Sequence, residues 1–195
     1  MPQLREQYLV LKIAEKKDPE AFGKLYDLYI ERIHRFIFFK VARKEDAEDL
    51  TSQVFLKAWQ SLTSQNAPRV YNFRGWIYEL ARNSVIDFYR KLGRMETLIS
   101  LDSLGEEEEI PDERQQFVLD QLYASDRAYL ADCLKKLKDD HREILVLRFL
   151  EEMNVGEIAK IVKKSPGNVR VLIHRGLKAL RGVYEARNKA QGTPT

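Results

Sequence analysis

Cysteine is almost absent from this chain of 195 residues, because Cys133 is its only one. A single cysteine cannot form an internal disulfide, and it cannot supply a zinc site that needs several thiolates. Cys133 lies at helical spacing from Leu130, Leu134 and Leu137, which is typical of a small side chain buried between helices, with a redox-sensing thiol as the alternative. A chain without disulfides suits a reducing compartment, and we expect a cytoplasmic protein.

Long hydrophobic runs are also missing. The most apolar stretch, from Phe36 to Phe39, is far too short to cross a bilayer. Residues 1–12 contain Arg5, Glu6 and Lys12 and have no apolar core, so we expect no secretion signal there. Apolar residues make up 44% of the chain and charged residues 32%, a balance typical of a globular protein.

Histidine is scarce, and its placement argues against an enzyme. The three histidines, His34, His141 and His174, are scattered along the chain, and no glycine-rich phosphate loop is present. A catalytic or metal centre needs several reactive groups to converge in one place. We therefore expect no catalytic residue, no metal and no cofactor.

Strand-like alternation is absent too, whereas helical periodicity runs along almost the whole chain. Asp18 followed by Pro19 predicts a helix start, because Asp caps free N–H groups and Pro has none to leave unpaired. A second helix carries acids in its first turns, where the helix dipole favours them: Glu45, Asp46, Glu48 and Asp49. A third is predicted over residues 73–91, after a loop over residues 63–72. The fold class is therefore all-α.

Acidic residues gather between residues 96 and 120. This stretch holds nine Asp or Glu and one base, Arg114, while Gly105 and Pro111 interrupt any helix there. Such a run is typical of a solvated linker. We predict two helical domains, over residues 1–95 and 123–187, joined by a flexible acidic linker over residues 96–122 and followed by a frayed tail over residues 188–195.

The C-terminal part has the pattern of a helix-turn-helix. A densely apolar helix over residues 144–150, which must be buried, precedes it. Asn154 and Glu157 have the spacing of a capping box and predict a helix start. After a turn over residues 163–165, Ser165 caps a second helix that has Pro166 at its first position.

The second helix of this pair is apolar on one side and basic on the other. Its inward positions are Val169, Ile173, Gly176, Leu177 and Leu180, with Leu172 at their edge. Its outward positions are Arg170, Val171, His174, Arg175, Lys178 and Arg181. Between residues 160 and 189 nine bases accompany one acid, Glu185. Charge of nearly one sign on a helix after a tight turn favours a fit to the phosphate-lined major groove over an ordinary charged exterior.

Three segments of the chain resemble sigma factors of bacterial RNA polymerase. Residues 142–181 resemble region four of these proteins, and residues 46–59 and 73–91 resemble region two, in the right order and at the right separation. In lacking a third domain, the chain resembles the extracytoplasmic-function type of the sigma-70 family. The resemblance implies a non-catalytic subunit that directs core RNA polymerase to promoters and initiates transcription. Its implied partners are the polymerase core, promoter DNA and, as a candidate, an anti-sigma factor, with no membrane partner.

The resemblance also assigns roles to particular residues. The −35 promoter duplex would be bound by Ser165, Asn168, Arg170, Val171, His174, Arg175 and Lys178. The melted −10 element would be bound by Arg69, Tyr71, Arg82 and Asn83, with Asn83 at the family position that contacts an extruded base and residues 65–72 shaping its pocket. The polymerase would be bound by Glu48, Asp49, Ser52 and Gln53. Phe73 and Trp76 could stack on bases, but core packing is the stronger interpretation.

The chain departs from the family pattern in two places. The family commonly has Gln-Glu where this chain has Ser52 and Gln53, so one carboxylate of the polymerase-binding helix is lost. Leu172 stands where many relatives have a DNA-contacting arginine, and its place at the edge of the apolar side suggests packing instead. In relatives the linker threads basic channels of the polymerase, so we expect the acids of residues 106–109 to aid assembly.

Two other classes of protein remain as alternatives. A stand-alone helix-turn-helix regulator would explain the C-terminal domain, but it leaves the motifs at residues 46–59 and 73–91 without a role. Dimerisation and palindromic half-sites would favour that regulator. A helical interaction module, or a degenerate sigma-like protein, would bind partners without promoter activity.

Overall fold

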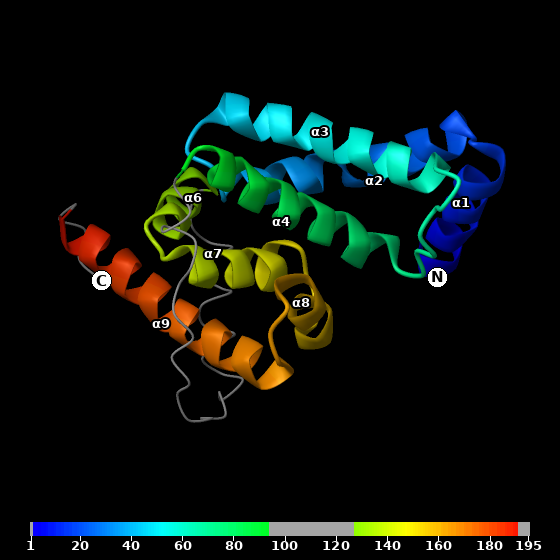
Figure 1. The fold of residues 1–195 in the computed structure, drawn as a ribbon. Helices are drawn as coiled ribbons and strands as arrows, with labels where there is room; N and C mark the ends of the chain where they lie inside the picture. The colour runs from blue at the N-terminus through cyan, green and yellow to red at the C-terminus, as the bar shows by residue number, and fades with distance from the viewer. Residues whose placement is uncertain (1, 94–126, 191–195) are drawn as a thin grey trace. The chain divides into compact units, whose positions relative to one another are not determined.

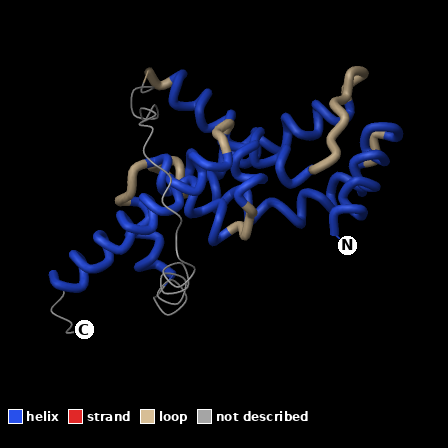
Figure 2. The backbone as a smooth tube through the Cα atoms, turned by 90° about the horizontal axis from the view of Figure 1, so that it is seen from below, coloured by secondary structure: helices blue, strands red, loops and turns tan. Residues whose placement is uncertain are grey.

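The computed structural model describes residues 2–93 and 127–190 of the chain. Within these two ranges there are helices and turns but no strand (Figure 2), so the predicted all-α fold is confirmed. The chain divides into two compact units, residues 1–96 and residues 97–195, and each is described by itself. The predicted acidic linker over residues 96–122 lies outside the described residues.

The described part of the first unit is a bundle of four helices (Figure 1). They are α1 (Pro2–Lys16), α2 (Pro19–Phe38), α3 (Lys44–Thr63) and α4 (Phe73–Lys91). α3 packs against both α2 and α4, and α1 packs mainly against α2. The largest fully buried side chains come from all four helices: Ile13, Leu25, Phe36, Leu62, Phe73 and Tyr78. Burying each such side chain contributes about 1.5–3 kcal/mol.

The start of α2 has the cap that the sequence predicts. The Asp18 carboxylate accepts hydrogen bonds from the backbone N–H groups of Glu20 at 3.0 Å and Ala21 at 3.1 Å, and Pro19 takes the first helical position. The N–H of Ala21 is the main cause that lowers the pKa of Asp18, and the nearby Lys12 ammonium, 3.3 Å away, adds to it. The ionised carboxylate therefore stabilises the folded state.

The cap at Asp18 makes a prediction about pH. Because the pKa of Asp18 is lower in the folded chain, its contribution is present above the unfolded pKa and is lost as pH falls through the folded one. We expect the stability difference between wild type and Asp18→Asn, whose amide caps without titrating, to shrink as pH falls below about 4. Urea unfolding followed by tryptophan fluorescence measures it, and a difference that does not change with pH would contradict the prediction.

Helix α1 was not singled out by the sequence patterns. It buries Leu9, Val10 and Ile13 against the bundle, while Tyr8 and Leu11 on its other side stay exposed. Apolar residues on two sides of one helix blur the periodicity that would have identified it. The bundle therefore has one more helix than the sequence analysis predicted.

The second unit contains the helix-turn-helix. Its described elements are α6 (Arg127–Lys135), α7 (Asp139–Leu145), a π-helical turn η2 (Val146–Leu150), α8 (Val155–Val162) and α9 (Pro166–Ala190). α9 packs against α7, α8 and α6. Cys133 on α6 is 1% exposed, so the prediction of a buried cysteine is confirmed. Tyr129 holds the start of α6 on α9, because its ring meets the edge of the Tyr184 ring with centroids 5.3 Å apart.

The structure corrects two predictions in this unit. The apolar helix expected over residues 144–150 is α-helical only to Leu145, and the π-helical turn η2 follows it. Phe149 and Leu150, expected to be buried, are only half-buried. Seven consecutive residues go almost twice around a helix, so they cannot all face one neighbour. The frayed tail expected over residues 188–195 is wrong for residues 188–190, because α9 runs on to Ala190; residues 191–195 lie outside the described residues.

Candidate nucleic-acid interface

Local hydrogen bonds fix the start of α8 and both ends of the turn between α8 and α9. At the start of α8 the Asn154 side chain accepts a bond from the Glu157 N–H at 3.0 Å, and Glu157 accepts one from the Asn154 N–H at 2.9 Å. Lys163 ends α8 in the left-handed region with φ of 58°, and its N–H reaches the Ala159 carbonyl. The Ser165 hydroxyl oxygen then accepts a bond from the Asn168 N–H at 3.2 Å. The predicted capping box and the predicted cap of α9 are both confirmed.

The capping box at Asn154 supports a mutational test. Asn154→Ala removes the acceptor for the Glu157 N–H and should cost the second unit about 0.5–2 kcal/mol of stability. Asn154→Asp keeps an acceptor and is the matched control. Thermal unfolding followed by far-ultraviolet circular dichroism compares the two, and equal melting temperatures would show that the cap contributes nothing.

The faces of α9 divide as the periodicity predicts. The inward positions are all buried: Val169, Ile173, Gly176, Leu177 and Leu180. Three basic side chains are exposed: Arg170, Lys178 and Arg181. Leu172 is half-buried, as expected for a residue at the edge of the apolar side. The residues predicted for −35 DNA thus fall into two groups, an exposed Ser165, Arg170 and Lys178 and a half-buried Asn168, Val171, His174 and Arg175.

His141 on α7 is coupled electrostatically to Arg175 of this surface. Partial burial is the main cause that lowers the pKa of His141, and the charges of Lys138 and Arg175 lower it further, against an opposing effect of Asp140. His141 is therefore mainly neutral at pH 7, since even the ordinary pKa of histidine is about 6.5. The positive charge of this part of α9 comes from Arg175 rather than from an imidazolium beside it.

In the first unit the loop between α3 and α4 is tied to the helices on both sides. The Ser64 hydroxyl, at the start of the loop, donates to the Ser61 carbonyl of α3 at 2.9 Å, and the Asn72 side chain, at its end, accepts a bond from the Gly75 N–H of α4 at 3.0 Å. Between these ends Arg69 is exposed, and Tyr71 keeps 69% of its surface exposed. The loop predicted over residues 63–72 is confirmed except at its start, because Thr63 still belongs to α3, and it presents an aromatic ring and a cation to solvent.

The remaining residues predicted for −10 DNA lie on α4. Arg82 and Asn83 are half-buried, and the rise of an α-helix places Asn83 about 15 Å along the axis from the start of α4. Phe73 is 1% exposed and packs against Tyr29, with ring centroids 5.4 Å apart, so its core role is confirmed. Trp76 packs on Phe73 and is half-buried.

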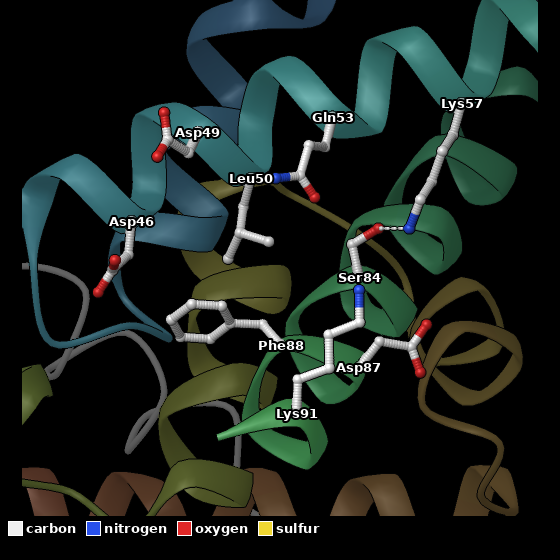
Figure 3. A pocket seen from close by; sticks show the side chains of 9 residues that line it. All are labelled: Asp46, Asp49, Leu50, Gln53, Lys57, Ser84, Asp87, Phe88 and Lys91. Carbon is white, nitrogen blue, oxygen red and sulfur yellow. Dashed lines mark hydrogen bonds between the residues drawn. The ribbon is translucent and has the colours of Figure 1, made fainter.

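The exposed side of α3 is a ridge with a hollow on each flank. Asp49 and Gln53 line the hollow toward α4, where the Lys57 ammonium donates to the Ser84 hydroxyl at 3.2 Å (Figure 3). Glu48 and Ser52 line the hollow toward α2, together with Ile30, Glu31 and His34. The four residues predicted to bind polymerase therefore lie on one ridge but face two sides of it.

Leu56 is a residue of this ridge that the sequence analysis missed. It lies one turn beyond Ser52 and Gln53, and the residue is 56% exposed. Exposed large apolar side chains beside a polar binding surface often serve as anchors for a partner. Its position away from the apolar stripe of α3 was the sequence signal that could have identified it.

Asp139, Asp140 and Glu143 form the one group of side chains, among the residues that the structure describes, close enough to share a metal ion. Asp139 is paired with Arg142 at 3.0 Å, and Asp139 and Asp140 occupy the first turn of α7, where the helix dipole favours them. The group therefore has a structural explanation. No helix in the described ranges is long and apolar enough to cross a bilayer.

Comparison with known proteins links these surfaces to one family. The model of sigma-70 region 2 matches residues 25–95, and that of sigma-70 region 4 matches residues 133–182. The chain is 31% identical to the ECF RNA polymerase sigma factor BldN of Streptomyces coelicolor over 86% of this chain, but it spans only 61% of BldN. It is 28% identical to the ECF RNA polymerase sigma factor SigW of Bacillus subtilis over 88% of this chain and 92% of SigW.

Solved structures share the fold. CnrH, in complex with the cytosolic domain of CnrY, matches with a TM-score of 0.67 at 21% identity, over 93% of this chain and 98% of CnrH. The sigma factor RpoE of Bartonella quintana, in complex with the anti-sigma factor NepR, matches with a TM-score of 0.61 at 20% identity, over 84% of this chain and 96% of RpoE. With both family regions matched in order, the chain belongs to the sigma-70 family of RNA polymerase sigma factors, in its extracytoplasmic-function type.

Proposed function

We propose that this chain directs core RNA polymerase to specific promoters by binding the −35 element as duplex and the −10 element as melted strand. One observation carries the proposal: a region 2 match with an exposed aromatic loop precedes a region 4 match whose helix-turn-helix has a basic outer side. The first domain would occupy residues 1–95 and the second residues 123–187, with the acidic segment over residues 96–122 linking them.

The proposed −35 contact is made by α9. Arg170 and Lys178 extend from its exposed side, and Ser165 and Asn168 lie at its N-terminal end, where a hydroxyl and an amide side chain suit a phosphate. Arg170 and His174 lie one helical turn apart, and Arg175 follows His174 directly; all three can approach base edges in a major groove. Val171 would add an apolar contact of the kind that thymine methyl groups accept.

The proposed −10 contact is made by the loop before α4 and by α4 itself. Tyr71 offers an exposed ring for a base to stack on, and Arg69 beside it offers a cation for the backbone, the combination that single strands favour. Asn83 would hydrogen-bond an extruded base through its amide, with Arg82 beside it on the same helix.

The proposed polymerase contact is the ridge of α3. Glu48 and Asp49 supply charge, Ser52 and Gln53 supply polar groups, and Leu56 supplies an apolar anchor one turn further along the helix. The Ser52 hydroxyl already donates to the Glu48 carbonyl at 3.1 Å, so Gln53 is the better placed of the two to reach a partner. Because Gln53 stands where the family commonly has a carboxylate, we expect Leu56 to contribute a larger share of the free energy of binding to polymerase.

The proposal has consequences for chemistry and location. The protein would act as a non-catalytic subunit of the polymerase holoenzyme and would work in the cytoplasm, where the polymerase and the promoters are. An anti-sigma factor is a further proposed partner, because a chain that activates transcription by binding polymerase can be silenced by covering the same surfaces.

Reconstitution tests the proposal directly. Purified protein is added to sigma-free core RNA polymerase, and transcription start sites are mapped on fragmented genomic DNA. Discrete start sites that depend on the protein would support the proposal, and their alignment would give both promoter elements. Tight DNA binding without polymerase association would instead favour a stand-alone regulator, and neither activity would point to an inhibited or degenerate sigma-like module.

A further inference from the structure

Helix α1 lies before the residues that the region 2 model matches, which begin at residue 25. It nevertheless reaches the loop that we propose binds melted DNA. The Gln7 side-chain amide donates a hydrogen bond to the backbone carbonyl of Tyr71 at 2.8 Å, across 64 positions of sequence. This bond connects α1 to the residue whose ring the loop exposes.

The residue before Gln7 makes a second connection to the same end of α4. The Tyr29 hydroxyl donates to the Glu6 carboxylate at 2.7 Å. The Tyr29 side chain is 3% exposed, and its ring packs edge-on against Phe73, the first residue of α4. Two consecutive residues of α1 therefore contact the loop and the buried ring that supports its end, which fixes α1 in register with the start of α4.

Tyr71 is held by its backbone and free at its side chain. Its carbonyl is bound by Gln7, and the next residue, Asn72, caps α4 through the Gly75 N–H. Tyr71 as a whole is 69% exposed, and it is among the large hydrophobic residues that lie at the surface. A backbone held on two sides restricts the directions in which the ring can point, and a group already in its bound orientation loses less entropy when a ligand binds.

We propose that Gln7 is a positioning residue for melted promoter DNA, acting through the Tyr71 backbone. This inference rests on the proposed function, because it assumes that the Tyr71 ring meets a base. It assigns to α1, which lies outside the matched region, a part in reading the −10 strand. Gln7 itself touches no base; its amide keeps the aromatic ring in the orientation that stacking requires.

The test uses the full chain assembled with core polymerase. The probe is a fluorescent single-stranded oligonucleotide that carries the −10 element obtained from the mapped start sites. Gln7→Met keeps the side-chain length but cannot donate to the Tyr71 carbonyl, and we expect it to weaken oligonucleotide binding about two- to tenfold. Glu15→Gln, an exposed change two turns along α1, is the matched control and should bind as wild type does.

A double-mutant cycle with Tyr71→Ala separates positioning from general stability. Tyr71→Ala keeps the carbonyl that Gln7 binds but removes the ring, so adding Gln7→Met should then cost nothing more. Affinity for core polymerase and for −35 duplex should stay unchanged in all variants. If the wild type binds the oligonucleotide and Gln7→Met binds it equally well, this inference is wrong while the proposed function stands. The same holds if Gln7→Met loses as much affinity in the Tyr71→Ala background as in the wild type. No sequence-dependent binding by the wild-type holoenzyme would overturn the proposed function and this inference with it.

Discussion

Replacing Arg170 by alanine is expected to weaken binding to the −35 duplex by about 1–3 kcal/mol, or roughly 5- to 150-fold. Arg170 is exposed in the second turn of α9, on the side away from the buried Val169 and Ile173. A guanidinium there can donate two hydrogen bonds to one guanine, and this discrimination is lost with the side chain. Anisotropy titrations of the holoenzyme at fixed salt, with the mapped −35 sequence and a scrambled duplex, measure the effect.

Two further variants separate base recognition from charge. Arg170→Lys keeps the charge but loses the planar fork, so it should lose specificity while nonspecific affinity is retained. Arg181→Ala removes the same charge about 16 Å further along α9, where Arg181 is paired with Glu185 at 2.7 Å. It should weaken all duplexes slightly and equally. If Arg170→Ala also weakens both duplexes equally, Arg170 contacts phosphate and reads no base.

Local signals in the sequence predicted the helix starts well. Asp18, Asn154 and Ser165 each bond N–H groups within three residues, so the atoms that define these caps are close together in the chain. The burial of Val169 and Leu180 on α9 followed from periodicity for the same reason. Features set by neighbouring positions are accessible to sequence reasoning because the backbone geometry of a helix fixes them.

Long-range contacts were beyond the same reasoning. The bond from Gln7 to the Tyr71 carbonyl joins residues 64 positions apart, and no periodicity connects them. The two flanks of the α3 ridge depend on which neighbours, α2 and α4, stand beside it. Whether the residues proposed for DNA and polymerase do bind them depends on partners that lie outside the chain, so these roles stay predictions.

A second large effect is expected at the crossing of α7 and α9, where Gly176 is buried. A Cβ atom at this position would lie 3.2 Å from Leu145 Cγ and 3.4 Å from both of its methyl carbons. Leu145 is 2% exposed and has little room to move. Gly176→Leu should therefore destabilise the second unit by about 1–3 kcal/mol, despite the better helix propensity of leucine. Thermal unfolding followed by far-ultraviolet circular dichroism measures the loss.

Gly182 is the matched control for Gly176, because it lies on the same helix, is exposed, and would have nothing within 4 Å of an added Cβ atom. Gly182→Leu should stabilise α9 by up to about 1 kcal/mol, since glycine is the poorer helix former. Both tryptophans, Trp59 and Trp76, lie in the first unit, so their fluorescence should change in neither variant. Opposite shifts in stability would mean that close packing of α7 on α9 holds α9 in place. Equal shifts would mean that Leu145 yields, and that the orientation of α9 depends on α8 and α6 instead.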